Sequence, residues 1–532
     1  MTPNQLRESI FRHLDGIVIA PIASILVEKK IANYLLKNKQ CTIEQMVQEF
    51  NCNSGYLAII IRALASQGFL QYQVDNSTNQ ISVSINDKTE IAFSYFNWYE
   101  EFAKTLFLTD AFTSNVVNSH SISILSPLFK KYKAIAQSNL DLETPSGQIQ
   151  YQILKHIEGL LVAPLVVNLG MTGMFHKYFM ETSFSADEFH REPEAFTVML
   201  DFFTFLGWFT EKKGKYQFTE AGLFYAKRAS AYGVTTSYLP TLKNIETLLF
   251  GDPNKLRDIA ISDTEIHVNR EMNVWGSGGA HSTYFKVIDE IIIDLFNKPI
   301  NEQPKGILDM GCGNGAFLQH IFTVIERQTL RGKMLEEHPL FLVGADYNQV
   351  ALKVTRANLI KADIWAKVIW GDISDPDLLA HDLQENYAID LKDLLNVRTF
   401  LDHNRIWSEP TNNSIIQSTS TGAFAYRGKL LPNNEVEANL YEHLQKWATY
   451  VNKFGLLLIE LHTVNPEIVA QNIGKTPATA YDVTHGLSDQ YILEIDEFVK
   501  VAAQVGLQSD PRFFQRFPNT NYATVSIHLL RG

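Results

Sequence analysis

Two apolar stretches in the first half of the chain repeat one another. The segment HLDGIVIAP at 13–21 matches HIEGLLVAP at 156–164. Apolar residues continue through both segments with few interruptions, which predicts two buried helices. Further along each copy, Thr42 and Ser185 stand shortly before an acidic residue. A hydroxyl side chain in that position is a frequent N-terminal cap, so a second helix is expected to begin at each of these residues.

Each copy then continues with the same two patterns. Apolar residues recur at helical spacing over 55–73 and 195–212, and alternating residues follow at 71–85 and 208–222. The first pattern predicts a longer helix and the second a short hairpin. Helices followed by a hairpin are typical of a winged helix. The first half therefore predicts two duplicated winged-helix-like modules within a mostly helical region.

The second half alternates short apolar runs with helical segments. Apolar strands are expected around 307–309, 341–348, 366–375, 387–403 and 455–464, and a late helix with paired strands completes the chain. This order predicts an α/β fold with a Rossmann-like, seven-stranded sheet.

These patterns divide the chain into five parts. The predicted parts are winged-helix-like module 1 at 1–92, a helical linker or lid at 93–150, module 2 at 151–235, a helical linker at 236–275 and an α/β core at 276–532. The glycine-rich segment at 272–291 is expected to be a loop that leads into a helix and closes over a ligand of the core.

The segment KGILDMGCGNGAFLQHI at 305–321 carries the strongest chemical signal. A strand ends at Asp309, a turn containing Gly311 and Gly313 follows, and a helix begins. Glycines let the backbone approach a ligand closely. Because Asp309 would repel a pyrophosphate, we expect a ligand with a cationic amino acid part. Asp346 and Asp372 end the next two strands, where they are expected to take the ribose hydroxyls and the adenine amine.

Composition and charge exclude several classes of function. The net charge of −12 disfavours a nucleic-acid partner. Three cysteines are too few for a disulfide framework and suit a reducing compartment, so a cytoplasmic location is expected. Both long apolar stretches are read as buried helices, and no membrane association is expected.

The catalytic half resembles the class I methyltransferases through DMGCGNG, ADYN and WGDI, in that order. The resemblance covers roughly residues 276–532. It implies a methyltransferase that uses S-adenosyl-L-methionine, bound by Asp309, Gly311, Gly313, Asp346 and Asp372.

Two groups of residues are candidates for the acceptor site. His403 follows the fourth strand, where related O-methyltransferases carry the histidine that deprotonates a hydroxyl; alternatively it caps a helix. Glu460 and His462 end the fifth strand on one face, and a later loop carries His485, Asp489 and Gln490. Two histidines with a carboxylate or amide oxygen are a suitable ligand set for a metal ion.

The whole arrangement resembles the methyltransferase of cyanobacterial polyketide loading modules, and in particular the first methyltransferase domain of the apratoxin loading module. The duplicated first half, GAFAYRG at 422–428 and THGLSDQY carry this resemblance. It implies C-methylation of malonyl-acyl carrier protein, an adjacent acetyltransferase-like domain, and a mononuclear iron site, with manganese as a substitute in crystals.

Under this resemblance the metal ligands are His462, His485 and Gln490, with Asp489 as the substitute for Gln490. The metal would act as a Lewis acid that stabilises the malonyl enolate. His403 is then a base or a group behind the ligands. Arg427 is expected to hold a carboxylate or a phosphopantetheine phosphate, or to form a surface salt bridge.

Two other functions remain open at this stage. One is a metal-free O-methyltransferase for a small molecule, with His403 as general base. The other is a winged-helix regulator that senses S-adenosylmethionine, which requires a basic face. The sequence leaves undetermined the number of methyl transfers, the metal, the third ligand, the oligomeric state and excision from a larger synthase.

Overall fold

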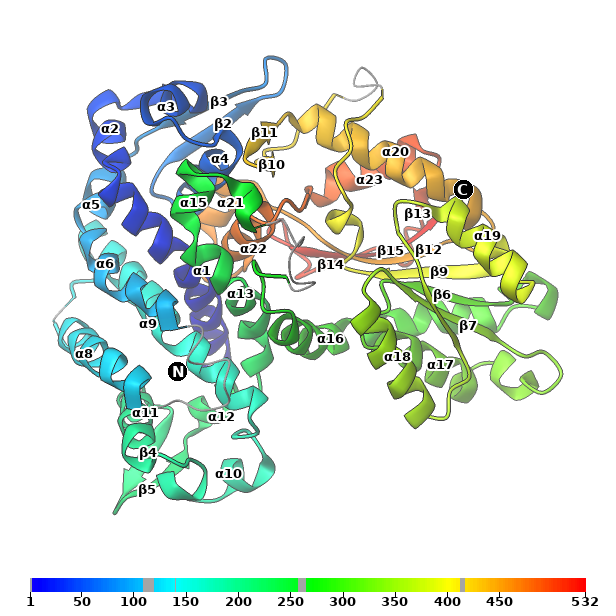
Figure 1. The fold of residues 1–532 in the computed structure, drawn as a ribbon, viewed down its shortest axis with the longest axis horizontal. Coiled ribbons are helices and arrows are strands. Elements are labelled where there is room, and N and C mark those ends of the chain that lie inside the picture. Colours follow the sequence, from blue (N-terminus) through cyan, green and yellow to red (C-terminus); the bar gives the residue numbers. More distant parts are fainter. Residues whose placement is uncertain (1, 109–118, 139, 257–264, 412–416) are drawn as a thin grey trace.

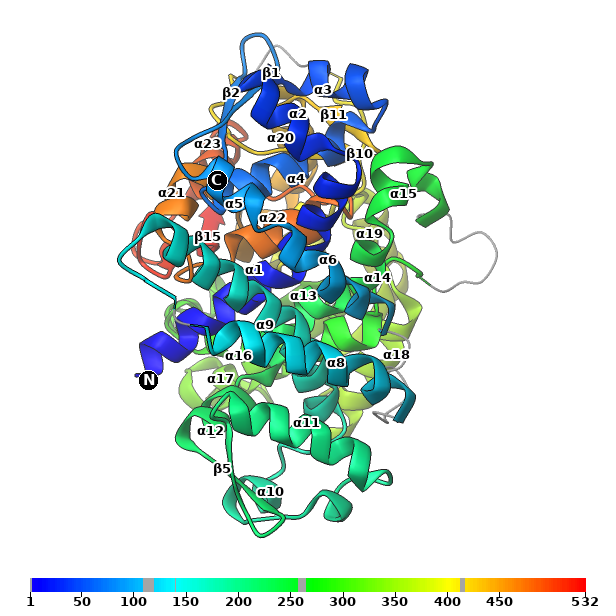
Figure 2. The ribbon, with the colours of Figure 1, turned by 90° about the vertical axis from the view of Figure 1, so that its left-hand side faces the viewer.

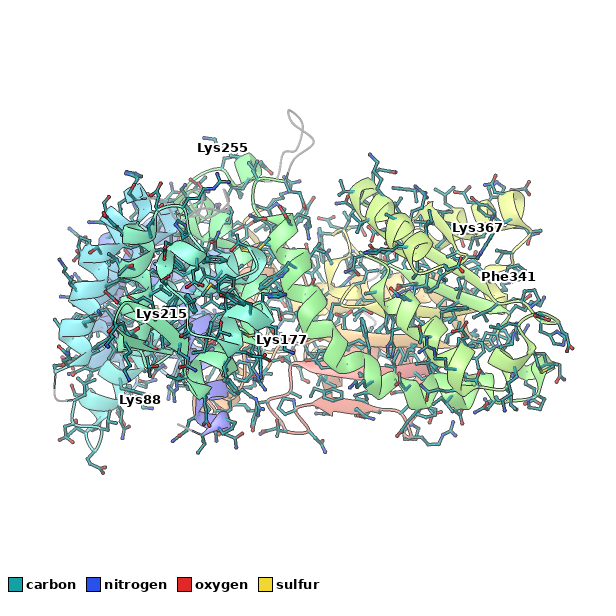
Figure 3. The ribbon with its side chains drawn as sticks, turned by 90° about the horizontal axis from the view of Figure 1, so that it is seen from below. Lys88, Lys177, Lys215, Lys255, Phe341 and Lys367 are labelled. Carbon is teal, nitrogen blue, oxygen red and sulfur yellow. The ribbon has the colours of Figure 1, made fainter. Side chains whose placement is uncertain are left out.

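The computed structural model describes residues 2–108, 119–138, 140–256, 265–411 and 417–532, without the side chains of 279–283. Two lobes lie side by side in Figure 1, a helical lobe built from the first half of the chain and an α/β lobe built from the second. Seen from below, Lys88, Lys177 and Lys215 mark the helical lobe, and Phe341 and Lys367 mark the far end of the α/β lobe (Figure 3).

The first module follows the predicted order of helices and hairpin. Its elements are α1 (Pro3–Glu28), α2 (Ile31–Asn38), β1 (Gln40–Thr42), α3 (Ile43–Phe50), α4 (Ser54–Ser66), β2 (Gln71–Asp75) and β3 (Gln80–Ser84). Thr42 caps α3 by accepting a hydrogen bond from the Gln45 backbone N–H, as predicted. The three strands form one antiparallel sheet in the order β1-β3-β2.

The second module follows a similar order, but its sheet has two strands instead of three. Its elements are α9 (Pro145–Met171), α10 (Lys177–Glu181), α11 (Pro193–Phe205), β4 (Phe209–Lys212), β5 (Lys215–Phe218) and α12 (Glu220–Ala226). The helix predicted after Ser185 is only a single 3-10 turn, Ala186–Glu188, although Ser185 forms the expected capping box with Glu188. The prediction of a second helix at this position is therefore wrong, since the segment forms one turn and does not continue as an α-helix.

Further helices connect the modules to each other and to the α/β lobe. They are α5 (Thr89–Ser94), α6 (Asn97–Ala103), α8 (Ser119–Ala136), α13 (Gly233–Ser237), α14 (Leu239–Lys243), α15 (Ile245–Phe250) and α16 (Arg270–Phe296). The segment 272–291 is therefore helical and not the predicted loop. A Cβ added to Gly276 would lie 2.7 Å from the Gly233 Cα. The absence of a side chain at Gly276 therefore allows α16 and α13 to pack closely.

The repeated motif forms the centre of the helical lobe, where α1 and α9 cross. A Cβ on Gly16 would lie 2.1 Å from the His156 carbonyl oxygen, and one on Gly159 would lie 2.3 Å from the His13 Cα. Each copy's glycine thus faces the other copy's histidine. Figure 2 shows the two helices crossing within the lobe. A single hydrophobic core contains residues from both modules, and it extends to Ala480 and Val483 of the α/β half.

The α/β half forms the predicted sheet. Its elements are β6 (Gly306–Met310), α17 (Ala316–Gln328), β7 (Phe341–Asp346), α18 (Gln349–Lys361), β8 (Lys367–Trp370), α19 (Pro376–Tyr387), β9 (Leu394–Thr399), β10 (Phe424–Tyr426), β11 (Lys429–Leu431), α20 (Asn433–Val451), β12 (Leu456–Leu461), α21 (Pro466–Gln471), α22 (Ala478–Gly486), α23 (Ile495–Gln504), β13 (Gln508–Ser509), β14 (Gln515–Phe517) and β15 (Val525–Arg531).

Seven strands follow the order β13-β15-β12-β9-β6-β7-β8, and β14 pairs with β15. Strands β6, β7, β8, β9 and β12 are parallel, whereas β15 runs antiparallel to β12. Their carboxyl ends therefore meet at one edge of the sheet, which is where open α/β sheets bind ligands. The fold class predicted from the sequence is confirmed.

Among the described residues, two helices are long and apolar enough to cross a membrane, α1 and α9. In their most apolar windows, 78% of α1 and 89% of α9 is buried inside the protein. Core helices pass the same test of length and composition, and this degree of burial agrees with the prediction of buried helices.

The helix crossing predicts different effects for two glycine substitutions. Gly159→Ala places a methyl group against the backbone of α1, so we expect it to lower the free energy of unfolding by roughly 3 kcal/mol. Gly278→Ala, inside α16 with its nearest neighbour at 3.8 Å, is expected to raise it by up to about 1 kcal/mol. Thermal unfolding of both variants tests this, and equal melting temperatures would contradict the crossing.

Candidate active site

The loop between β6 and α17 has the geometry of a ligand cradle. Gly311, Gly313 and Gly315 all have positive φ, at 77°, 54° and 77°. A side chain on Gly311 would collide with Leu401, at 2.8 Å. Gly313 is open: apart from the residues next to it in the sequence, the atom nearest to a Cβ at this position is the Gly311 carbonyl oxygen, at 3.9 Å. The loop thus presents bare backbone to a bound molecule.

Three aspartates lie around this loop, at or just beyond the carboxyl ends of β6, β7 and β8. Asp309 is only 1% exposed, and its Oδ2 has no hydrogen-bond partner among the described residues. Burial, together with the charge of Asp346, raises the pKa of Asp309 to about 8. Asp346 accepts a hydrogen bond from the Gly313 N–H at 3.0 Å, and Asp372 accepts one from the Ser374 N–H at 2.8 Å.

The arrangement suits the cofactor that the sequence implies. A buried carboxylate without a partner is costly unless a cation pairs with it, and the ammonium group of S-adenosylmethionine is such a cation. Asp309 would hold that group beside the glycine loop, and Asp346 and Asp372 would hold the nucleoside. All five predicted cofactor residues therefore lie together at one edge of the sheet.

Two aromatic residues at the same edge were not predicted. Tyr347 and Trp370 are 61% and 37% exposed, and their ring centroids are 5.6 Å apart. They stand directly after Asp346 and at the end of β8. Exposed aromatic faces at this position suit a flat purine. Both residues stand in the motifs ADYN and WGDI, one residue after Asp346 and two residues before Asp372. The sequence could therefore have indicated them.

The acceptor side of the site contains a histidine held by a buried carboxylate. His403 lies in a 3-10 turn just after β9, and Glu460 lies near the end of β12. The His403 Nδ1 and the Glu460 Oε1 are 2.5 Å apart. Glu460 also accepts hydrogen bonds from the backbone N–H groups of Asp402 at 2.8 Å and Leu461 at 2.7 Å. Because the carboxylate fixes the proton on Nδ1, the Nε2 lone pair of His403 stays free to accept a proton.

Charged residues behind this pair keep it in place. Asp402 pairs with Arg398 at 2.5 Å and with His443 at 2.9 Å, and all three side chains are buried. Although burial acts to raise its pKa, these neighbours lower the pKa of Asp402 to about 2. His403 is therefore part of a structured polar network and does not cap a helix.

A second histidine faces His403 across the site. His485 lies near the end of α22, and its ring centroid is 5.3 Å from that of His403, at an interplanar angle of 72°. Its Nδ1 donates to the Tyr481 carbonyl oxygen at 2.8 Å, which leaves Nε2 with a lone pair. Burial and the neighbouring His403 lower the pKa of His485 to about 3, so its ring is neutral near pH 7.

The predicted metal ligand His462 lies outside this pair. Its Nδ1 donates to the Leu493 carbonyl oxygen at 3.0 Å, and its Nε2 is 2.6 Å from the Ser526 hydroxyl. Ser526 is in turn 2.7 Å from His528 Nε2. With both ring nitrogens engaged inside the protein, His462 has no lone pair to offer a metal, and we correct that assignment.

The iron site implied by the sequence is therefore not assembled from the predicted set. Gln490 donates from Nε2 to the Tyr238 hydroxyl at 3.2 Å. Within the described residues, no group of three or more His, Cys, Asp or Glu side chains is arranged to hold a metal ion. The donors beside the proposed acceptor site include the Nε2 atoms of His403 and His485. The hydrogen bond of Gln490 uses its Nε2 and not its amide oxygen, so Gln490 as a ligand stays a prediction.

The remaining candidates lie at the contact with the helical lobe. Arg427 occupies the turn between β10 and β11 with φ at 50°, and it donates to the Asn254 side chain at 2.8 Å. Its backbone N–H donates to Asp489 at 3.3 Å. Asp489 also accepts a hydrogen bond from the Tyr56 hydroxyl at 2.8 Å. Asp489 is thus engaged with neighbouring protein groups.

The sheet order, the glycine loop and the acids around it define an S-adenosylmethionine-dependent methyltransferase of class I. Three family models match the chain in sequence order: an AprA N-terminal domain at 6–72, an AprA winged helix domain at 158–252 and an AprA MT2-like domain at 265–528. The chain belongs to the AprA-like methyltransferases. The resemblance drawn from the sequence names the first methyltransferase domain of such a module, whereas the matching model is described as MT2-like.

The solved structures that are similar to this chain are distant. An O-methyltransferase family protein from Burkholderia thailandensis is 11% identical, over 70% of this chain and 94% of that one, with a TM-score of 0.36. The O-methyltransferase NcsB1 from neocarzinostatin biosynthesis, in complex with S-adenosylmethionine, is 15% identical over 70% and 96%, with a TM-score of 0.39. The CurJ carbon methyltransferase is 11% identical over 81% and 99%, with a TM-score of 0.34. These similarities are too distant to inform the choice of acceptor. Comparison with curated proteins finds no match.

The raised pKa of Asp309 predicts pH-dependent cofactor binding. Below about pH 8 the free protein carries a proton on Asp309, which a cationic ligand must displace. The affinity for S-adenosylhomocysteine should therefore rise as the pH is raised toward 8, with proton release visible by calorimetry in buffers of different ionisation enthalpy. Asp309→Asn should weaken binding by about 1.5–3 kcal/mol and abolish the proton release. Asp372→Asn should weaken binding but keep the proton release, whereas pH-independent binding by the unmodified protein would refute the role of Asp309.

The hydrogen bonds of His462 predict a loss of stability when the ring is removed. His462→Ala leaves Ser526 and the Leu493 carbonyl buried without their partner, at a cost of about 1–3 kcal/mol in unfolding free energy. The metal content of purified protein, measured by elemental analysis, should not change. Loss of a bound metal with unchanged stability would restore His462 as a ligand.

Proposed function

We propose that this methyltransferase transfers a methyl group to the α-carbon of a malonyl group carried on an acyl carrier protein, with His403 as the base. The observation that carries the proposal is the His403–Glu460 pair, which lies at the carboxyl ends of β9 and β12 beside the glycine loop. The AprA-like family and its resemblance to polyketide loading modules support the carrier-bound acceptor.

The cofactor and acceptor sites are adjacent. Leu401, two residues before His403, packs against Gly311 of the glycine loop. S-adenosylmethionine supplies an electrophilic methyl group when it is bound. The task that remains for the protein is to remove a proton from the acceptor and to hold the resulting nucleophile in line.

The buried pair is suited to that task. A malonyl α-carbon is acidic because the thioester carbonyl takes up the charge as an enolate. His403 Nε2 accepts the α-proton, and the imidazolium that forms lies beside the Glu460 carboxylate, with which it pairs. The three hydrogen bonds that Glu460 accepts hold its carboxylate still throughout. The second imidazole, His485, contributes a neutral acceptor opposite.

The first experiment identifies the acceptor. Malonyl-carrier protein is incubated with enzyme and S-adenosylmethionine, and the intact mass of the carrier protein is measured. The carrier protein should gain the mass of one methyl unit. Saponification then cleaves the thioester: methylmalonate among the released acids indicates methylation at carbon, whereas malonate with methanol indicates a methyl ester. A chain that leaves malonyl-carrier protein unchanged but methylates a small-molecule hydroxyl would replace the proposal with the O-methyltransferase reading, in which the same pair deprotonates a hydroxyl.

The role of His403 predicts a large kinetic effect. His403→Ala should lower kcat by about 10²- to 10⁴-fold with little change in the affinity for S-adenosylhomocysteine. His320→Ala is the matched control, because His320 is a partly exposed histidine paired with Asp289 away from the acceptor side. A His403 variant that retains full activity would eliminate His403 as the base.

A further inference from the structure

Helix α4 of the first module lies along α22, the helix that carries His485, over the whole length of α22. The two helices run in opposite directions and contact each other at every turn. Gln67, just after α4, donates to the Thr479 hydroxyl at 2.8 Å, and Arg62 pairs with Asp482. Ile59 lies 2.9 Å from the position of a Cβ on Gly486, and Tyr56 donates to Asp489 at 2.8 Å.

These contacts bury a helix face that a winged-helix protein uses for binding. Twelve residues of α4, from Gly55 to Ser66, are buried. In a DNA-binding winged helix, the corresponding helix is exposed so that it enters the major groove. Here α4 is covered by α22 and by the β10–β11 hairpin, as Figure 1 shows. The surface that a DNA-binding winged helix leaves free is occupied here by the second half of the same chain.

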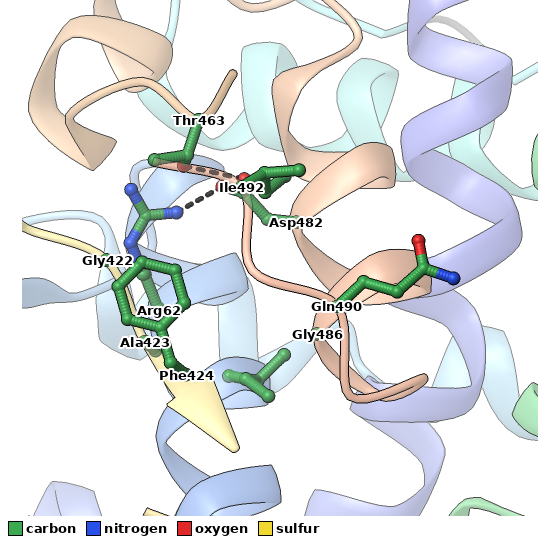
Figure 4. Close-up of a pocket in the computed structure, with 10 residues that line it drawn as sticks. Arg62, Gly422, Ala423, Phe424, Thr463, Asp482, Gly486, Gln490 and Ile492 are labelled. Atoms are coloured by element: carbon green, nitrogen blue, oxygen red, sulfur yellow. Dashed lines mark hydrogen bonds and ion pairs between the residues drawn. The ribbon is translucent and has the colours of Figure 1, made fainter. Parts of the chain in front are cut away.

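Arg62 is the centre of this contact. It is 2% exposed, and all three of its nitrogens are engaged. One terminal nitrogen pairs with Asp482, the other donates to the Val464 carbonyl oxygen at 2.7 Å, and Nε donates to the Thr421 carbonyl oxygen at 2.8 Å. Figure 4 shows the guanidinium facing Asp482 and Thr463. The Thr463 hydroxyl completes the group by donating to Asp482 at 2.7 Å.

The pocket beside this group is small. Arg62, Thr463 and Asp482 line it, and it has room for about one water molecule. Asp482 is three residues before His485, so the two side chains lie about one helical turn apart on the same helix. A shift of α22 would therefore move the His485 ring relative to His403.

We propose that Arg62 is a positioning residue for the acceptor site, which places His485 by holding Asp482 and thereby the register of α22. The proposal rests on the proposed function for the role of His485 in methyl transfer. Removing Arg62 leaves Asp482 buried without its cation, so α22 must move to let water or another donor reach the carboxylate. Displacement of a reacting group by about 1 Å costs up to roughly a hundredfold in rate.

A double-mutant cycle tests this role. Arg62→Met is made in the unmodified protein and in His485→Ala, and kcat for methyl transfer is measured in all four proteins. In the unmodified background we expect kcat to fall about ten- to a hundredfold, with unchanged affinity for S-adenosylhomocysteine. In the His485→Ala background we expect no further fall, because Arg62 acts through His485. Equal losses in both backgrounds would overturn the proposal.

A matched control separates positioning from stability. Thr479→Val removes the hydrogen bond with Gln67 on the same pair of helices, two turns away from His485. It should lower the melting temperature while kcat remains unchanged. Arg62→Lys keeps the charge opposite Asp482 but loses the guanidinium fork, so a partial recovery of kcat relative to Arg62→Met is expected.

A readout without substrate keeps the test independent of the proposed acceptor. In histidine-labelled protein, Arg62→Met should shift the His485 imidazole signals, assigned from their loss in His485→Ala, and leave the His320 signals unchanged. If malonyl-carrier protein proves not to be the acceptor, these signals still decide the role of Arg62. His485 signals that do not shift in Arg62→Met would overturn the positioning role of Arg62. If Arg62→Met fails to fold, Asp482→Asn is used in its place.

Discussion

The close crossing of α1 and α9 is the constraint on which the rest of the structure depends. Only glycine at positions 16 and 159 lets the two backbones approach until each meets the other copy's histidine. At that distance the two modules share one core instead of forming two. The crossing also reaches the catalytic half directly, because Gln67 donates both to Asp15, beside the crossing, and to Thr479 of α22.

The two copies have diverged in what they do around this crossing. His13 pairs with Glu158 of the other copy at 3.0 Å, whereas His156 bonds the Tyr99 hydroxyl at 2.7 Å. The long helix of copy 1, α4, packs against α22 of the catalytic half. Its counterpart α11 packs against α8, where Phe202 stacks on Phe129 at 4.1 Å. A duplicated framework therefore provides one module that holds the catalytic half and one that completes the helical lobe.

Local chemistry was predictable from the sequence, and long-range pairing was not. The glycine loop, the acids at the strand ends and both hairpins each depend on roughly 20 residues or fewer of the sequence, and all formed where expected. Strand alternation placed Glu460 and His462 on one face, but it does not reveal which side chains a neighbouring strand supplies. Ser526 of β15 forms a hydrogen bond with the His462 ring, and His403 forms one with Glu460. The helical segment at 272–291 was misread because its glycines serve packing against Gly233 and not a turn.

The buried pair at the proposed acceptor site depends on the order of the strands. His403 is 6% exposed and Glu460 is 1% exposed, so little water reaches either side chain. A carboxylate in such a place needs hydrogen-bond donors, and Glu460 accepts from the backbone N–H groups of Asp402 and Leu461 as well as from His403. Those N–H groups belong to the segments that follow β9 and end β12, two strands that are neighbours in the sheet. The sheet therefore fixes the geometry of the pair that the proposed proton transfer uses.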